Sequence, residues 1–88
     1  MSDHPCPCCG FLTFDEPPPG TYDICPVCYW EDDPVQFEDP SYPGGANRVS
    51  LAQARQNFRD LGAKSTEFVG NVRPPLDDER PGKQRGIR

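Results

Sequence analysis

The feature that most constrains the fold is a pair of Cys-x2-Cys motifs, Cys6/Cys9 and Cys25/Cys28, separated by 15 residues. Two such pairs at this spacing are typical of a site in which four thiolates bind one zinc ion. The chain has 88 residues, of which 34% are hydrophobic and 12 are proline, so it has little material for an apolar core. Domains of this kind usually need a disulfide, a metal or a partner to stay folded. We therefore predict one structural Zn²⁺ held by Cys6, Cys9, Cys25 and Cys28.

Disulfides are a weaker interpretation of the same cysteines. The chain contains five cysteines, an odd number that cannot be paired completely. Residues 1–5 lack the basic start and the apolar stretch of a signal peptide, and no apolar run approaches the roughly 20 residues of a membrane span. We expect a cytoplasmic protein without membrane contact, whose thiols stay reduced and available to a metal.

The residues beside the cysteines favour the tight turn, or knuckle, that wraps around a metal. A proline follows the first cysteine of each pair and fixes φ near −65°. Gly10 follows the first pair and can take the left-handed conformation that closes such a turn, whereas Tyr29 stands at the equivalent position after the second pair. A tetrahedral site filled by four thiolates has no open position, so we expect a structural rather than a catalytic metal.

Secondary structure is predicted mainly in two places. Residues 11–14 and 22–25 are typical of short strands, joined by a turn at residues 15–20. Residues 50–61 are predicted to be a helix, with a capping box at its start and a glycine at its end. Its apolar face, which we expect to rest on the strands, consists of Leu51, Ala54, Phe58 and Leu61.

The predicted fold class is a small metal-stabilised α+β domain. It is a zinc ribbon, in which two Cys-x2-Cys knuckles lie on a short antiparallel sheet, plus one packed C-terminal helix. We expect this domain to span residues 1–76 and residues 77–88 to form a flexible basic tail. Residues 31–47 are rich in proline, glycine and acid, and we expect them to be irregular.

A set of short motifs resembles a known family. They are CPCCG at residues 6–10, PPGTY at 18–22, CPVCYWEDD at 25–33, GGAN at 44–47 and Ser50-Leu51. Together they resemble the small bacterial CPCC cysteine-rich proteins over about residues 4–76. The resemblance implies a stand-alone cysteine-rich domain that binds zinc. It also suggests an accessory role beside a bacterial toxin, as an immunity-type partner.

Two further residues have metal-binding or reactive side chains. Cys8 is interpreted as a turn residue with an exposed thiol, as a competitor of Cys6 or Cys9 for the metal, or as a redox or nucleophilic thiol. His4 is the only histidine, and as a ligand it would displace a cysteine from a complete set. Because no nucleophile–base set accompanies it, we expect no enzymatic activity.

The acidic segment after the second cysteine pair has two interpretations. In one, it is a loop packed on the ribbon with its aromatic side chains in the core. In the other, it is a docking surface for a basic protein, because acids steer association and aromatic residues supply contact energy. The residues predicted for this surface are Trp30, Glu31, Asp32, Asp33, Phe37, Glu38 and Asp39.

Three functions fit the sequence. We expect a zinc-binding module that interacts with another protein, because the formal charge is −5 and all 14 acids lie before residue 80. One alternative is an iron-containing electron carrier of the rubredoxin type, since Cys-Pro-x-Cys motifs also hold iron. The other is a nucleic-acid-binding zinc ribbon, supported only by the basic tail. An acidic body lacks the Lys/Arg surface for phosphate contacts, so we expect no nucleic-acid partner.

Overall fold

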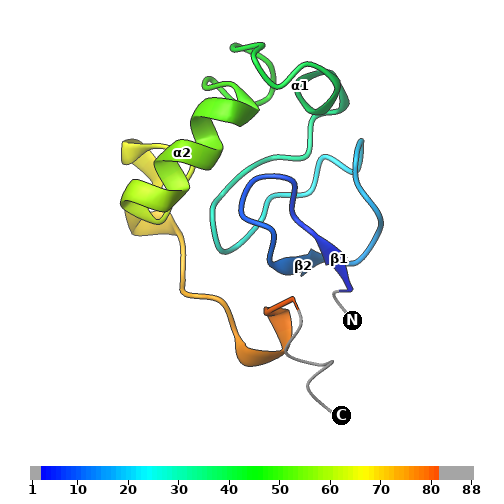
Figure 1. Ribbon diagram of the computed structural model, residues 1–88, viewed down its shortest axis with the longest axis vertical. Coiled ribbons are helices and arrows are strands. Elements are labelled where there is room, and N and C mark those ends of the chain that lie inside the picture. Colours follow the sequence, from blue (N-terminus) through cyan, green and yellow to red (C-terminus); the bar gives the residue numbers. More distant parts are fainter. Residues whose placement is uncertain (1–2, 82–88) are drawn as a thin grey trace.

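The computed structural model describes residues 3–81 (Figure 1). The elements in this range are β1 (His4–Pro5), β2 (Leu12–Phe14), α1 (Pro34–Glu38), α2 (Leu51–Leu61) and the 3-10 helices η1 (Thr66–Asn71) and η2 (Asp77–Glu79). After α2 the chain passes back along the cysteine segment and places η2 in contact with β2 (Figure 1). Within the described range, no helix is long and apolar enough to cross a membrane.

Each Cys-x2-Cys motif lies inside a small hairpin of its own. β1 and β2 pair antiparallel around the first motif, and Ile24 and Glu31 form an isolated antiparallel bridge around the second. The prediction that residues 11–14 and 22–25 form one hairpin is therefore wrong. The knuckle brings its own flanking residues into hydrogen-bonding distance, and the proline-rich residues 15–20 connect the two hairpins.

The predicted helix is confirmed as α2. The hydroxyl of Ser50 accepts a hydrogen bond from the backbone N–H of Gln53 at 3.1 Å, which satisfies one of the unpaired donors in the first turn. Gly62 ends the helix at φ 84°, and its N–H donates to the carbonyl of Phe58. The capping residues visible in the sequence therefore determine both ends of α2.

The apolar face of α2 is confirmed for its first two turns only. Leu51 and Ala54 are fully buried, and Phe58 is half-buried and meets Phe11 edge to face at 6.1 Å between ring centroids. Leu61 is 45% exposed, so the prediction that it packs on the cysteine segment is wrong. It lies in the last turn of α2, just before Gly62, and the chain becomes buried again at Ala63.

A short helix interrupts the segment that we expected to be irregular. The carboxylate of Asp33 accepts hydrogen bonds from the N–H groups of Val35 and Gln36, and Pro34 occupies the first turn of α1. The other oxygen of Asp33 accepts from the N–H of Ala46 at 2.9 Å. Asp33 thus begins α1 and fixes the GGAN segment against it.

The side chains of Gln36 and Asn47 form the centre of a buried polar network. The Asn47 amide donates to the carbonyl of Glu31 and to Gln36 Oε1, both at 2.9 Å, and the N–H of Glu31 donates to Asn47 Oδ1 at 2.9 Å. A Cβ atom at Gly45 would lie 2.6 Å from Asp33 Oδ2, so only glycine fits there. The network gives the GGAN motif a structural role.

The apolar core is small and surrounds the cysteines. Its nine buried members are Cys6, Cys8, Phe14, Cys25, Val27, Cys28, Trp30, Leu51 and Ala54. Four of the nine are cysteines, so the packing of the core depends on how the sulfur atoms are arranged. This matches the expectation that a chain of this composition needs an additional stabilising centre.

Ordered structure continues past the predicted boundary at residue 76. Glu79, in η2, is buried, and its carboxylate accepts hydrogen bonds from both terminal nitrogens of Arg73 at 2.9 and 2.8 Å. The N–H of Leu76 donates to the same carboxylate. Residues 82–88 of the predicted basic tail lie outside the described residues.

We predict that Asn47→Ala lowers the free energy of unfolding by at least about 3 kcal/mol, because each buried group left without a partner costs about 1–3 kcal/mol. The matched control is Asn71→Ala, at an exposed asparagine, which should change stability by less than about 0.5 kcal/mol. Urea denaturation of the two variants measures both values. Equal destabilisation would contradict the role of the network.

Candidate metal centre

The two knuckles share one backbone hydrogen-bond pattern. The N–H of Cys6 donates to the carbonyl of Phe11 at 2.9 Å, and the N–H of Cys25 donates to the carbonyl of Trp30 at the same distance. In both cases the donor is the first cysteine and the acceptor lies five residues further along the chain. The second motif therefore repeats the geometry of the first.

The residue that closes each knuckle adopts the left-handed conformation. Gly10 has φ 81° and Tyr29 has φ 73°, and their N–H groups donate to the carbonyls of Cys6 and Cys25 at 2.8 Å. A tyrosine rarely takes this conformation. Its ring stacks on Phe68 of η1, with centroids 4.6 Å apart, and this contact helps to hold it. The missing glycine in the second motif does not change the turn.

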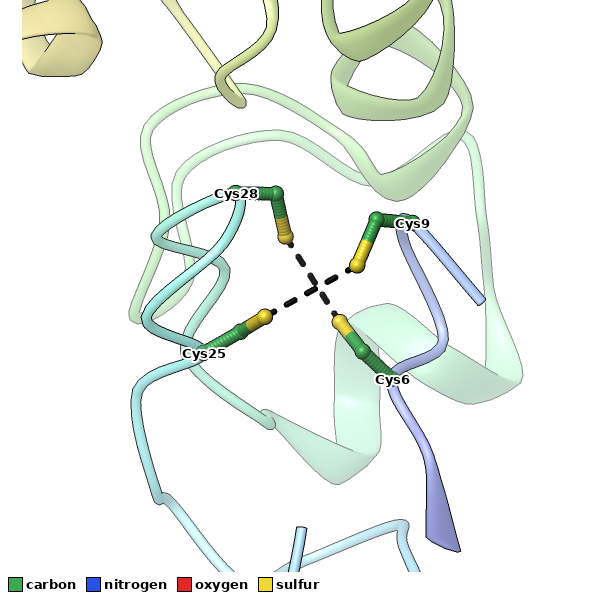
Figure 2. Close-up of side chains that lie close together, drawn as sticks. All are labelled: Cys6, Cys9, Cys25 and Cys28. Carbon is green, nitrogen blue, oxygen red and sulfur yellow. Dashed lines mark hydrogen bonds between the residues drawn. The ribbon is translucent and has the colours of Figure 1, made fainter. Parts of the chain in front are cut away.

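The four predicted ligands are brought together at one point (Figure 2). The Sγ atoms of Cys6, Cys9, Cys25 and Cys28 all lie within 4.8 Å of one another, with 3.6 Å between Cys6 and Cys28 and 3.7 Å between Cys9 and Cys25. Four sulfurs placed tetrahedrally at about 2.3 Å from an ion would be about 3.8 Å apart. The sulfur positions therefore fit a tetrahedral metal ion.

Hydrogen bonds to sulfur favour negative charge at the centre. The N–H of Cys8 donates to Cys6 Sγ and the N–H of Val27 donates to Cys25 Sγ, both at 3.4 Å. The hydroxyl of Thr13 in β2 donates to Cys25 Sγ at 3.2 Å. Such second-layer donors stabilise thiolates and orient them toward a metal.

The thiols also influence one another. Hydrogen bonds from Cys28, Cys6 and Cys9 lower the pKa of Cys25. The hydrogen bond to Cys25 is the main cause that raises the pKa of Cys28 and of Cys6. The neighbouring sulfurs therefore compete for the same protons. A metal ion that binds there displaces those protons, and its affinity falls as the pH is lowered.

Cys8 is not part of the four-sulfur cluster, although it lies close to it. Its side chain is only 8% exposed, so the interpretation as an exposed thiol is wrong. Its thiol interacts with Cys28 and raises the pKa of that ligand. The CPCC motif therefore supplies two of the four clustered thiols, one turn proline and one buried thiol beside the cluster.

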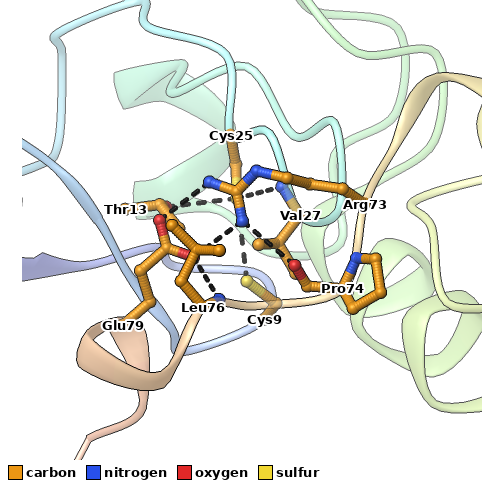
Figure 3. A network of polar contacts seen from close by, with 8 residues as sticks. All are labelled: Cys9, Thr13, Cys25, Val27, Arg73, Pro74, Leu76 and Glu79. Atoms are coloured by element: carbon orange, nitrogen blue, oxygen red, sulfur yellow. Dashed lines mark hydrogen bonds and ion pairs between the residues drawn. The ribbon is translucent and has the colours of Figure 1, made fainter.

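A polar network attaches the C-terminal segment to the second knuckle (Figure 3). The N–H of Arg73 donates to the carbonyl of Pro26, inside the Cys25–Cys28 turn, at 3.1 Å. The Arg73 guanidinium, held by Glu79, faces the side of the cluster where Cys9 and Cys25 lie. Glu79 and the negative charge of Cys25 both raise the pKa of Arg73, with the hydrogen bond to Glu79 the larger cause.

The predicted docking surface is not brought together at the molecular surface. Trp30 and Asp32 are fully buried and Asp33 is 6% exposed, so the prediction that these side chains meet a partner is wrong. Asp32 accepts a hydrogen bond from the N–H of Thr21, and Asp33 caps α1. Backbone N–H groups satisfy both oxygens of Asp33 and Oδ2 of Asp32, whereas Asp32 Oδ1 is buried without a hydrogen-bond partner among the described residues. Of the remaining predicted residues, Glu31 and Phe37 are half-buried, and Glu38 and Asp39 are exposed.

Five polar residues with structural contacts could not be recognised from the sequence. They are Gln36, Asn47, Lys64, Arg73 and Glu79, all of which make buried or half-buried polar contacts. The only signal for them is the GGAN motif, in which an asparagine follows two glycines. Their side-chain hydrogen bonds reach up to 17 residues along the chain, and the backbone N–H of Arg73 reaches back to Pro26, so local patterns do not reveal them.

We predict one metal ion per purified chain and its loss in Cys9→Ser. The loss should also unfold the domain, since structural zinc contributes roughly 10–16 kcal/mol in small peptides. Cys8→Ser is the matched control, because it changes the neighbouring thiol and should leave metal content unchanged. Elemental analysis measures the metal content, and circular dichroism measures whether the domain is folded. Metal retained in Cys9→Ser and lost in Cys8→Ser would contradict the ligand assignment.

A second prediction concerns pH and Glu79. The hydrogen bond from Arg73 lowers the pKa of Glu79 below its ordinary value of 4.5, so the ion pair stabilises the fold above that pH and is lost as the pH falls through the lowered pKa. Glu79→Gln should reduce the free energy of unfolding by about 1–3 kcal/mol at pH 7, and the difference from wild type should shrink below pH 4.5. Asp78→Asn, at an exposed neighbour, should show neither effect. Chemical denaturation across this pH range tests the prediction.

Comparison with known proteins agrees with this geometry. A family model described as "Cysteine-rich CPCC" matches residues 4–79, which contain the four clustered cysteines, the Gln36–Asn47 network and the Arg73–Glu79 pair. No curated protein matches the chain. On the strength of a match that covers most of its length, the chain belongs to the Cysteine-rich CPCC family.

Proposed function

We propose that this protein is a small zinc-dependent binding module whose partner is another protein, and that it is not an enzyme. The observation that carries the proposal is the closed set of four sulfur atoms, which leaves a bound ion no position for water or substrate. Zinc is favoured because it takes four thiolates in structural sites. Metal-binding thiols must be reduced, which fits the cytoplasm.

Iron is the second candidate for the same site. The paired N–H···S hydrogen bonds, one in each knuckle, would also stabilise one iron bound by four thiolates. Elemental analysis of the freshly purified protein distinguishes the two metals. A colourless zinc protein supports the structural role, whereas a red iron protein would replace it with electron transfer.

The partner surface that we now propose is the outer side of α1 and the turn after it. Val35 is 56% exposed and Tyr42 is 43% exposed, and Glu38 and Asp39 between them are exposed acids. Backbone hydrogen bonds from Asp39 to Val35 and from Tyr42 to Asp39 keep these residues adjacent. We call these four residues the α1 surface. It keeps the acidic and aromatic character expected from the sequence, on side chains that a partner can reach.

A partner that fits the α1 surface is basic. Acidic side chains steer a basic protein during association, and an exposed aromatic residue provides buried contact after docking. A toxin that acts on nucleic acid presents a basic surface of this kind, which would suit an accessory or immunity-type role. The acidic body repels nucleic acid itself, so we propose no direct nucleic-acid contact.

We predict that Glu38→Lys combined with Asp39→Lys slows association with the partner and leaves metal content unchanged. The wild-type association rate should fall as salt rises, because steering is screened beyond about 8–10 Å. Affinity capture with the wild type as bait identifies the partner, and surface plasmon resonance measures its association rate.

The control variant carries the same change in charge elsewhere, as Asp60→Lys with Glu67→Lys on α2 and η1, where both acids are exposed. It should retain most of the association rate. Equal rates for the α1-surface variant and wild type would rule out docking at this surface.

A further inference from the structure

Lys64 is a buried cation. It is 6% exposed, and among the described residues its ammonium makes one side-chain hydrogen bond, to Asn47 Oδ1 at 2.8 Å. No ion pair within residues 3–81 involves it. Its Nζ atom lies 4.7 Å from the ring centroid of Phe68 and 5.7 Å from that of Tyr29. Burying an ammonium group with so few partners is unfavourable unless negative charge lies nearby.

The backbone of Lys64 is bonded to the second knuckle. Its backbone N–H donates to the carbonyl of Cys28 at 2.7 Å, which anchors residue 64 directly on a ligand residue. Burial lowers the pKa of Lys64, while the charges of Glu31, Cys28, Glu67 and Cys8 act in the opposite direction. Glu31 acts most strongly among these charges, and Cys28, a member of the cluster, acts next. Together with the backbone contact to Cys28, this charge interaction couples Lys64 to the cluster as well as to Glu31.

A four-thiolate site that holds a divalent ion is stabilised by a nearby positive charge. Four thiolates and one divalent ion carry a net charge of −2, and Cys25 and Cys28 are fully buried. Arg73 also faces the cluster, but Glu79 already neutralises it through two hydrogen bonds. Among the described residues, Lys64 has no carboxylate in hydrogen-bonding contact, so its positive charge acts on the metal centre as well as on Glu31.

We propose that Lys64 is the counter-charge of the four-thiolate centre and biases it toward divalent ions. Zn²⁺ and Fe²⁺ leave the centre at −2, whereas Fe³⁺ leaves it at −1. A fixed positive charge stabilises the −2 state about twice as strongly, because the interaction energy is proportional to the product of the charges. Lys64 thus acts on the metal centre through its charge and makes no bond to the ion. The proposal rests on the metal site proposed above.

The test compares Lys64→Met with Arg59→Met. Arg59 is exposed on α2, so its variant loses the same charge away from the cluster. Competition with a chromophoric chelator should show roughly 10- to 100-fold weaker Zn²⁺ binding in Lys64→Met and little change in Arg59→Met. In protein reconstituted with Fe²⁺, the one-electron Fe³⁺/Fe²⁺ potential measured at an electrode should become more negative only in Lys64→Met.

Two more variants separate charge from packing. Lys64→Arg keeps the charge and should restore a potential near that of wild type. Lys64→Gln removes the charge but keeps a donor for Asn47, so it provides the same test if Lys64→Met does not fold. Weaker zinc binding with an unchanged potential would show that Lys64 acts through packing alone and would overturn the proposal. A wild-type chain that binds neither Zn²⁺ nor Fe²⁺ would instead refute the metal site itself.

Discussion

The rest of the structure depends on the convergence of four sulfur atoms from two hairpins that do not pair with each other. Each knuckle folds through its own backbone hydrogen bonds, from Cys6 to Phe11 and from Cys25 to Trp30. Strand pairing cannot hold the hairpins together, because the described strands pair only within one of them. Within the described residues, the sulfur cluster and the hydrogen bond from Thr13 to Cys25 Sγ link the two hairpins directly.

The remaining segments attach to the outer sides of the knuckles at equivalent positions. Arg55 of α2 donates through Nε to the carbonyl of Pro7, and Arg73 donates through its backbone to the carbonyl of Pro26. Each acceptor is the proline that follows the first cysteine of its pair. The same prolines that shape the turns therefore expose the carbonyls that receive the helix and the C-terminal segment. A second layer, centred on Asn47, joins the loop after Trp30 to Lys64.

The parts of the structure that depend on neighbours in the sequence could be predicted. Cysteine spacing identified the clustered ligands, and the capping residues identified α2. Strand pairing could not be predicted, since the choice between two local hairpins and one longer hairpin depends on where the sulfurs meet. The burial of Asp32 and Asp33 was missed for a related reason. A run of acids is typical of a solvated surface, and the N–H groups of Thr21 and Ala46, which help to bury Asp32 and Asp33, lie 11 and 13 residues away.

The order of these residues along the chain has a consequence for biosynthesis. All four clustered cysteines lie within residues 6–28, whereas Lys64, Arg73 and Glu79 follow much later. The ribosome releases the amino-terminal part first. A nascent chain therefore presents its sulfur atoms to the cellular metal pool while the segments that later close over the second knuckle are still being made. The four sulfur atoms that could hold an ion are therefore available before the fold is complete.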